Sequence, residues 1–280
     1  MNKISAVLPI AVWDFERSKI LFRSLNKYFD SESIEIIYIA FPEKEKMQKM
    51  LQALGFKFNY KIIHENDIIP NRDHRIFKRT RGWLRQQIVK MYISKFLNTQ
   101  FYICMDSDII CKKPTKYDDL IVEGKPKVNM EPKSLHKVWW KDAIKVLKID
   151  NPITTEGMSS STNIFITEEV LALIDYIEKI YKKSFIMTLC NWIWTKSRVF
   201  NVRWTEYKLY WSFIEYRNKV NDYKTNDVVW GESIWKCTEY VNEELFKSIL
   251  TSTEGYFTIC QSTRLKNEDV LNHAIKYLDI

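Results

Sequence analysis

The first 110 residues alternate between short apolar runs and longer stretches with apolar residues at helical spacing. Apolar runs occur at residues 4–10, 34–41 and 101–105, and helical spacing occurs at 16–29 and 81–97. A run of four to eight apolar residues is typical of a buried strand, whereas apolar residues three or four apart line one face of a helix. This alternation predicts βαβ units and a mostly parallel sheet flanked by helices.

The rest of the chain continues as an α/β protein that is richer in helix. We expect helices at residues 134–147, from Thr205 and at 267–278, and a late strand at 255–260. With only six glycines and seven prolines, the chain shows no flexible linker and no clean domain boundary. A chain of this length can bury a large core. The sequence therefore predicts a single α/β domain over residues 1–280, with a helix-rich C-terminal half.

Charge and cysteine content limit the partners and the compartment. The chain has 43 lysines and arginines against 35 aspartates and glutamates, a net charge of +8. This favours polyanionic partners such as nucleotides, nucleic acid or an acidic membrane, although scattered lysines are also typical of a solvated surface. The five cysteines form no Cys-x-x-Cys pair, so a reducing, cytoplasmic compartment fits best. No run reaches the ~18 apolar residues that a membrane span needs.

Two aspartates follow the apolar run at 101–105, in the motif Asp106-Ser107-Asp108. Residues two apart on a strand point to the same side, so both carboxylates would converge at the carboxyl end of a strand, where parallel sheets bind ligands. Convergent carboxylates are costly to desolvate without a cation. Oxygen ligands suit Mg²⁺ or Mn²⁺, with phosphate oxygens in the open positions. The alternative is a capped turn that precedes the Lys-Lys-Pro segment.

Three motifs extend this pattern: GWLRQQIVK at residues 82–90, DSD at 106–108 and TEYKLY at 205–210. Together with the N-terminal strand and the helix after it, they resemble the glycosyltransferase-A superfamily of nucleotide-sugar enzymes. The likeness is closer to a bacterial branch assigned to surface-polysaccharide assembly. It covers most of the chain with the motifs in the right order, and the three motifs together are more specific than any one alone.

This resemblance implies a fold, a cofactor and two substrates. The fold would be a glycosyltransferase-A-like domain in which residues 1–115 bind the nucleotide and residues 116–280 form the acceptor side. Asp106 and Asp108 would hold Mn²⁺ or Mg²⁺. The donor would be a nucleotide-sugar, with a UDP-sugar favoured, and the acceptor a saccharide or a lipid-linked sugar. A peripheral position on the inner face of a membrane suits that acceptor and the positive charge.

The third metal ligand and the catalytic base remain to be assigned. Many members of the superfamily use a late histidine as a ligand, but this chain has Gln261 there, and His273 lies further on in a predicted helix. Glu206 lies in the first turn of a predicted helix, which favours its ionised form. It is our first candidate for the base of an inverting transfer, or else an ordinary helix-start acid. Glu232 is the alternative base and takes the role if Glu206 is buried and structural. Inversion is favoured, although retaining enzymes share the fold and the metal motif.

Other polar residues are candidates for the donor site. Gln87 and Lys90 lie three apart and share one face of a predicted helix that starts beside Arg81. These three residues would reach a diphosphate or a nucleotide base, or form a polar face turned to water. Ser107 belongs to the donor site through its place in the motif. Asp14 follows the first strand, where it would meet the base or ribose of a nucleotide or merely cap the next helix.

Trp204 and Asn163 are the candidates for the acceptor side. Six of the ten tryptophans lie between residues 192 and 235. Aromatic rings fill cores and also present flat faces on which other groups stack, and Trp204 is the ring we would place against an acceptor because Glu206 is near. Asn163 ends the Ser-Ser-Ser-Thr-Asn run, which would line a sugar pocket or form a plain polar loop.

Two other classes of function stay open. A nucleotidyltransferase would use Asp106 and Asp108 similarly, but such enzymes commonly have a Gly-rich loop after the first strand, and LPIAVWDFER has no glycine. A non-enzymatic basic module that binds nucleic acid or an anionic membrane would explain the charge, but two paired acids would repel phosphate without a metal. We therefore expect a metal-dependent glycosyltransferase with no nucleic-acid partner. The sequence does not indicate its oligomeric state.

Overall fold

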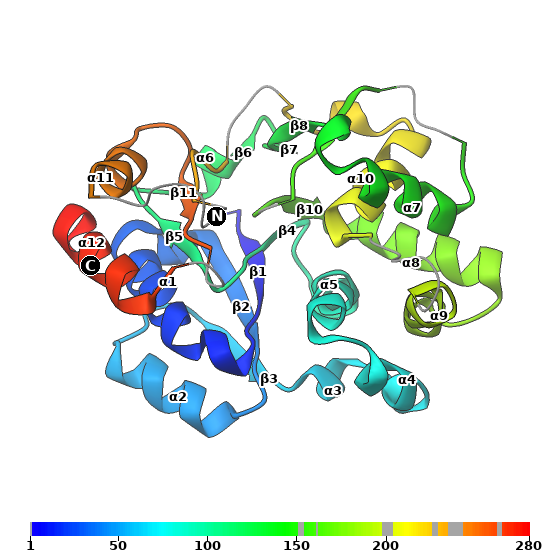
Figure 1. The fold of residues 1–280 in the computed structure, drawn as a ribbon, viewed down its shortest axis with the longest axis horizontal. Helices are drawn as coiled ribbons and strands as arrows, with labels where there is room; N and C mark the ends of the chain where they lie inside the picture. Colours follow the sequence, from blue (N-terminus) through cyan, green and yellow to red (C-terminus); the bar gives the residue numbers. More distant parts are fainter. Residues whose placement is uncertain are drawn as a thin grey trace.

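A mostly parallel sheet forms the centre of the fold (Figure 1). Its strand order is β10-β4-β1-β2-β3, in which β4, β1, β2 and β3 are parallel and β10 runs antiparallel to β4 at one edge. The strands are β1 (Ile4–Pro9), β2 (Ile34–Ala40), β3 (Tyr60–Ile63), β4 (Phe101–Cys104) and β10 (Ile164–Ile166). The prediction of a single α/β domain with a mostly parallel sheet is therefore confirmed.

The computed structural model describes residues 2–150, 154–160, 162–197, 204–225, 229–234, 243–261 and 265–280. Its helices are α1 (Phe15–Tyr28), α2 (Lys44–Ala53), α3 (Glu65–Ile68), α4 (His74–Arg79), α5 (Gly82–Tyr92), α6 (Tyr117–Leu120), α7 (Lys137–Leu147), α8 (Thr167–Tyr181), α9 (Phe185–Ser197), α10 (Glu206–Tyr216), α11 (Glu243–Thr251) and α12 (Asn267–Leu278). The other strands are β5 (Ile109–Cys111), β6 (Ile121–Val122), β7 (Lys125–Pro126), β8 (Met130–Pro132), β9 (Glu156–Met158) and β11 (Phe257–Ile259).

The two faces of the sheet are covered by different helices. Because successive side chains of a strand point to opposite faces, Ala6 and Leu8 of β1 pack in one core cluster with residues of α1 and α2, whereas Val7 packs with residues of α5 and α8. Figure 1 shows α1 and α2 on one side of the sheet and α5 and α8 on the other. Helices on both faces bury β1 and β4 along their whole length, whereas β2 and β3 carry the exposed residues Glu35 and Lys61.

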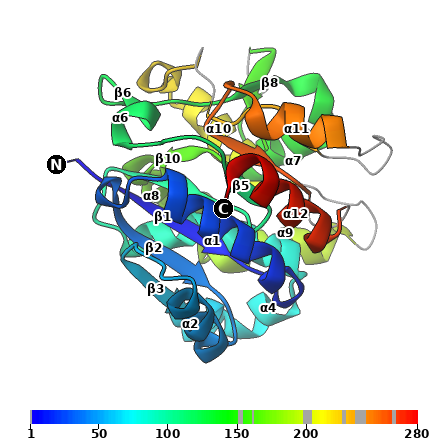
Figure 2. The ribbon, with the colours of Figure 1, turned by 90° about the vertical axis from the view of Figure 1, so that its left-hand side faces the viewer.

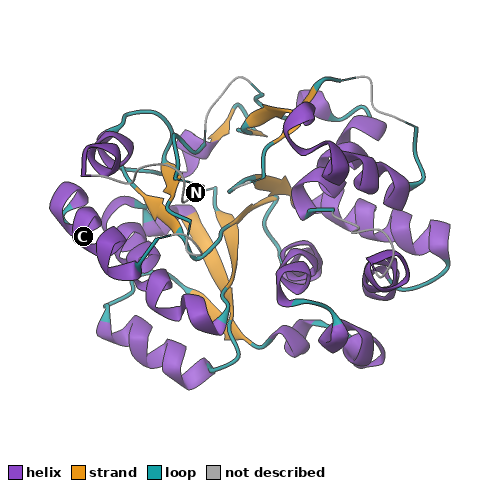
Figure 3. Cartoon of the chain, in the orientation of Figure 1, coloured by secondary structure: helices purple, strands orange, loops and turns teal. Residues whose placement is uncertain are grey.

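The C-terminal half is rich in helix, as predicted. Helices α7 to α10 gather on the right-hand side in Figure 3, beyond the β10 edge of the sheet. The late strand β11 pairs antiparallel with β5 in a separate two-stranded sheet. Helix α12 returns to α1, where the hydroxyl of Tyr28 donates to the carbonyl of Leu278 at 2.8 Å, and Figure 2 shows these helices side by side. In the described part of the chain, no helix is long and apolar enough to cross a membrane.

This topology brings two chain segments to one edge of the sheet. Strands β1 and β4 are neighbours and run in the same direction, so both carboxyl ends lie at the same edge. The turn that ends at Asp14 follows β1, and the Asp106-Ser107-Asp108 segment follows β4. Ligands of open parallel sheets bind at this edge, and the candidate site is built there.

Candidate active site

The Asp106-Ser107-Asp108 segment forms a turn between β4 and β5. Strand β4 ends at Cys104, and the N–H of Ile109 donates to the carbonyl of Asp106 at 3.4 Å. Because the backbone is no longer extended here, the period of two that predicted convergent carboxylates does not apply. The side chains of Asp106 and Asp108 accordingly have different neighbours.

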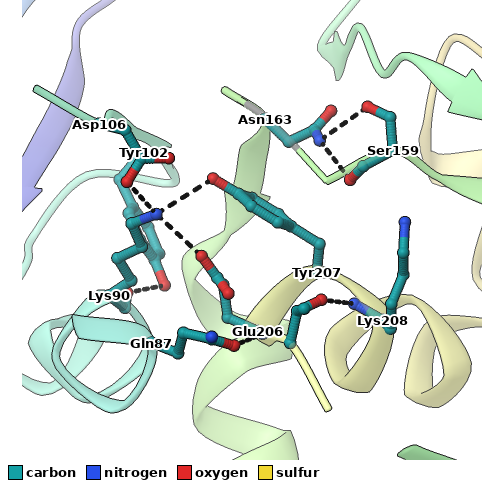
Figure 4. A network of polar contacts seen from close by, with 10 residues as sticks. Gln87, Lys90, Tyr102, Asp106, Ser159, Asn163, Glu206, Tyr207 and Lys208 are labelled. Atoms are coloured by element: carbon teal, nitrogen blue, oxygen red, sulfur yellow. Dashed lines mark hydrogen bonds and ion pairs between the residues drawn. The ribbon is translucent and has the colours of Figure 1, made fainter. Parts of the chain in front are cut away.

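Asp106 belongs to a cluster of charges centred on Lys90. The ammonium of Lys90 lies 2.7 Å from Oδ1 of Asp106, 2.9 Å from Oε1 of Glu206 and 3.5 Å from the hydroxyl of Tyr207. Figure 4 shows these three groups around the Lys90 nitrogen. Lys90 comes from α5, Asp106 follows β4, and Glu206 and Tyr207 begin α10. The cluster therefore joins three segments, and Lys90 and Glu206 are 116 positions apart.

Burial sets the charges in this cluster. The side chains of Lys90 and Glu206 are 4% and 3% exposed, whereas that of Asp106 is 35% exposed. Burial by itself lowers the pKa of Lys90, but the carboxylates of Asp106 and Glu206 outweigh it and hold this pKa well above its usual value. Burial raises the pKa of Glu206, and the nearby Lys90 charge partly opposes this. Lys90 is therefore a permanent cation that faces two acids.

Gln87 and Lys90 both reach the start of α10. The side chain of Gln87 accepts a hydrogen bond from the backbone N–H of Glu206 at 3.0 Å, and Thr205 accepts one from the N–H of Lys208 at 3.2 Å. The i, i+3 spacing on α5 puts Gln87 and Lys90 on one face, as the sequence predicted. The side chains of Gln87 and Lys90 make contacts within the protein and do not face water. They therefore position α10 against β4.

Asp108 lies in a second, mostly buried environment. Its carbonyl accepts a hydrogen bond from the N–H of Cys260 at 3.0 Å. The guanidinium of Arg17, on α1, is buried, and its charge interacts with the carboxylates of Asp108 and Asp14. Burial lowers the pKa of Arg17, and the charges of its neighbours, Cys260, Asp108 and Asp14, oppose that shift. The two aspartates of the motif therefore each face a different buried cation.

The sequence reasoning missed Arg17. It lies three and four positions before Ile20 and Leu21, on the stripe of α1 that faces the core. A charged residue on an apolar stripe was the signal that could have found it, because buried charges need partners. Its Nη2 donates to the carbonyl of Leu265, and among the described residues Nε and Nη1 have no hydrogen-bond partner. Asp14 occupies the N-cap position of α1 but makes no side-chain capping hydrogen bond.

The remaining donor-side and acceptor-side candidates are spread out. Arg81 is exposed just before α5, and Ser107 is nearly buried in the turn. Trp204 is fully buried, so the structure supports its role in the core, and its ring is not open to a sugar. Asn163 is also buried; its amide nitrogen donates to the carbonyl and hydroxyl oxygens of Ser159 at 3.1 and 3.3 Å (Figure 4).

Glu232 is exposed on a segment that is fixed to β11. Its carbonyl accepts from the hydroxyl of Thr258, and the N–H of Ile234 donates to the carbonyl of Ile259 at 2.8 Å. The backbone beside Glu232 packs closely on a turn at Gly255, which has φ of +64°. A Cβ at Gly255 would lie 2.2 Å from the nitrogen of Gly231, so only glycine fits. The carboxylate is thus accessible while its backbone is held in place.

Asp106, Asp108 and Gln261 are the candidate ligands for a divalent cation. In the described ranges, no group of three or more His, Cys, Asp or Glu side chains could hold a metal ion. Asp106, Asp108 and Gln261 offer oxygen donors only, which is the chemistry that Mg²⁺ and Mn²⁺ prefer. Gln261 follows Cys260, the residue that pairs with the backbone of Asp108. His273 lies elsewhere, on α12, where its ring stacks on Phe246. The donor types present therefore suit a hard cation, which would take its other ligands from a substrate.

Comparisons with known proteins address the family and the fold. The model of a family of unknown function (DUF6492) matches residues 1–280. No curated protein matches the chain. Among solved structures, the crystal structure of mouse xyloside xylosyltransferase 1 in its apo form is similar, with a TM-score of 0.51 and 10% sequence identity. The alignment covers 95% of this chain and 100% of that chain. At this identity the likeness shows that the two proteins share a fold.

Proposed function

Because the chain belongs to a family of unknown function (DUF6492), we propose its function from the site: a metal-dependent glycosyltransferase that uses a nucleotide-sugar donor. The observation that carries the proposal is the placement of Asp106 and Asp108. They follow β4 at the ligand-binding edge of a parallel sheet, in a fold shared with a xylosyltransferase. Each faces a buried protein cation, Lys90 or Arg17.

The donor side of the site would lie between the ends of β1 and β4. The charges of Asp14 and Asp108 both act on the buried guanidinium of Arg17, and the two aspartates follow the neighbouring strands β1 and β4. Arg17 is buried, and a buried cation needs acidic partners. We therefore assign Arg17 to holding Asp14 and Asp108 in place, and we assign Asp14 to the nucleoside end of the donor. A UDP-sugar is the favoured donor, on the resemblance alone.

A cation would be held by Asp106 and Asp108, with the amide oxygen of Gln261 as a candidate third donor. When bound, it supplies positive charge to the leaving diphosphate. Lys90 has a different role, because its ammonium is enclosed by Asp106, Glu206 and Tyr207. It fixes the Asp106 carboxylate, and Gln87 fixes the helix that carries Glu206. Both are positioning residues.

Glu232 is the better candidate for the base of an inverting transfer. An acceptor hydroxyl must come within hydrogen-bond reach of the base. Glu206 is buried and paired with Lys90, whereas Glu232 is exposed on a fixed segment. Its carboxylate would take the proton of the acceptor hydroxyl as that oxygen attacks the anomeric carbon. A saccharide or lipid-linked acceptor, and a role in surface-polysaccharide synthesis, are proposed from the resemblance of the three motifs.

A thermal-shift screen tests this proposal. UDP-, GDP-, CMP- and dTDP-sugars would each be added with and without Mn²⁺ to the wild type and to Asp108→Asn. A ligand at a hundred times its dissociation constant stabilises a protein by about 2.7 kcal/mol, which raises Tm by several degrees at this size. We expect one nucleotide family to give a shift that needs Mn²⁺ and is lost in Asp108→Asn. A shift indifferent to both the metal and the substitution would overturn the proposed site.

A further inference from the structure

The positive charge of the protein is concentrated in two segments, residues 71–85 and 133–148. Together they contain eleven lysines and arginines and two aspartates, a net charge of +9. The whole chain carries +8, so the remaining residues together carry −1. Both aspartates, Asp73 and Asp142, are buried. Lys133 and Arg85 pair with acids of other segments, and the exposed charge that remains on these two segments is mostly positive, although the lysines look scattered along the sequence.

The two segments meet in space through aromatic rings. Trp83, at the start of α5, lies against Trp139 of α7, with ring centroids 6.2 Å apart, and His136 stacks on Trp139 at 4.3 Å. Helix α4, which lies in the first segment, carries the exposed residues Arg75, Lys78 and Arg79. Figure 1 shows α4, α5 and α7 in the same half of the molecule. We call the exposed side chains of residues 75–83 and 135–148 the basic face.

The basic face also exposes large apolar side chains. Leu135 is 64% exposed, Val138 53% and Trp83 49%. The exposed positions of α7 are Lys137, Val138, Lys141 and Lys145, and the exposed Lys148 follows the helix, while the opposite stripe packs in the core. Apolar side chains among cations on a helix surface are the pattern of segments that lie in the interface of an anionic bilayer, where tryptophans favour the headgroup level.

We propose that the basic face docks on the surface of an anionic lipid bilayer. Lysine side chains place their charge at the phosphates while their aliphatic stems cover apolar surface, and Leu135 and Val138 would enter the acyl boundary. A nucleic acid would use the same cations but has no use for exposed aliphatic side chains. The apolar residues therefore favour a bilayer over RNA or DNA.

Docking would bring the candidate site close to the lipid headgroups. Trp83, Gln87 and Lys90 lie at positions i, i+4 and i+7 on α5 and so share a face. Trp83 is about 10 Å along the helix from Lys90, at 1.5 Å per residue. A lipid-linked acceptor could then reach the site while its lipid stays in the bilayer. The docking itself needs neither sugar nor catalysis, so it stands or falls separately from the proposed function.

Vesicle sedimentation tests the proposal. Full-length protein would be mixed with vesicles of 30% phosphatidylglycerol in phosphatidylcholine, or of phosphatidylcholine alone, at 0.15 M NaCl. We expect binding to the anionic vesicles only. Each basic side chain near such a surface changes the partition coefficient about fivefold, so Lys137→Glu with Lys141→Glu should lower it at least 25-fold. The matched control, Lys49→Glu with Lys247→Glu, removes the same charge from exposed sites on α2 and α11 and should bind much more tightly than that variant.

A second variant separates a bilayer from a nucleic acid. Leu135→Ser with Val138→Ser keeps all the charges and alters only exposed side chains, so the fold is retained. We expect it to weaken vesicle binding at least fivefold and to leave the binding of a 20-nucleotide RNA unchanged. The proposal would be overturned if no binding to anionic vesicles occurred, if the two charge variants bound equally, or if the apolar variant bound vesicles like the wild type.

Discussion

Lys90 is the residue on which the geometry of the site depends. Its ammonium contacts acids from two other segments and its own backbone carbonyl accepts a hydrogen bond from the hydroxyl of Tyr102 at 3.0 Å. A buried ion pair adds little net stability compared with a well-packed apolar core, but removal of one partner leaves an uncompensated charge. The cluster is thus better understood as a device that fixes Asp106 than as a source of stability.

Replacement of Lys90 with methionine should destabilise the protein strongly. Lys90→Met leaves Glu206 buried without a cation, which should lower the free energy of unfolding by about 3 to 5 kcal/mol. Urea unfolding measures this loss. The double variant Lys90→Met with Glu206→Gln removes both charges of the buried pair. It should therefore recover a large part of the unfolding free energy that the single variant loses. The exposed Lys49→Met control should change the unfolding free energy by less than about 0.5 kcal/mol. Equal losses in the single and double variants would contradict the role given to Lys90.

Lys208 gives a pH dependence with a definite sign. Its ammonium is fully buried, donates to Glu131 and to the carbonyl of Met158, and lies 4.8 Å from the ring of Trp140. Burial lowers its pKa from 10.5 to about 8, against the opposing charge of Glu131. Between these two values the unfolded chain binds the proton more tightly than the folded protein does. Stability contributed by this group therefore rises as the pH rises from 8 toward 10.5.

The measurement is a comparison of urea midpoints for the wild type and Lys208→Met at pH 7 and pH 10. We expect the difference in unfolding free energy to move by about 2 kcal/mol in favour of the wild type over this interval. Titration of other groups cancels in the difference. A difference that stays constant, or that moves in favour of Lys208→Met, would show that Lys208 does not titrate as described.

At the scale of elements, local patterns were sufficient to predict most of the first half. The apolar runs became β1, β2 and β4, and the predicted helix at 81–97 is α5 followed by a short 3-10 turn. The turn at Asp106 was the main departure. An apolar run predicts a strand but not the residue at which it ends, and β4 ends two residues before Asp106 because pairing with β1 stops at Cys104.

Gln87 and Gln86, which are adjacent on α5, form a matched pair for testing the contact between α5 and α10. Gln87 accepts the N–H of Glu206, whereas Gln86 lies next to it on a more exposed face of α5. Gln87→Ala would leave a buried N–H without a partner, which costs about 1 to 3 kcal/mol, while Gln86→Ala should be close to neutral. Urea unfolding of both variants provides the comparison. Similar effects of the two substitutions would mean that Gln87 does not hold α10.

At the scale of the whole molecule, the fold class followed from periodicity, but the site depended on distant contacts. The sequence identified Glu206 and Lys90 separately, and nothing in their local patterns indicates that they touch across 116 positions. The same limit applies to Trp204: its closeness to Glu206 in the sequence favours an acceptor contact, but the fold buries its ring completely. Burial is a property of the folded chain. A single sequence predicts which side chains are buried only where apolar residues recur at the spacing of a strand or a helix.

The central claim is that this protein transfers sugars from a nucleotide donor at the Asp106–Asp108 edge of the sheet. Release of free nucleotide from a panel of nucleotide-sugars, with Mn²⁺ present and water accepting the sugar in place of the acceptor hydroxyl, measures this most directly. We expect one donor to be consumed by the wild type, about 10²-fold or more slowly by Glu232→Gln, not measurably by Asp108→Asn, and normally by Lys49→Met. Release from no donor by the folded protein, or release that Asp108→Asn leaves unchanged, would contradict the account.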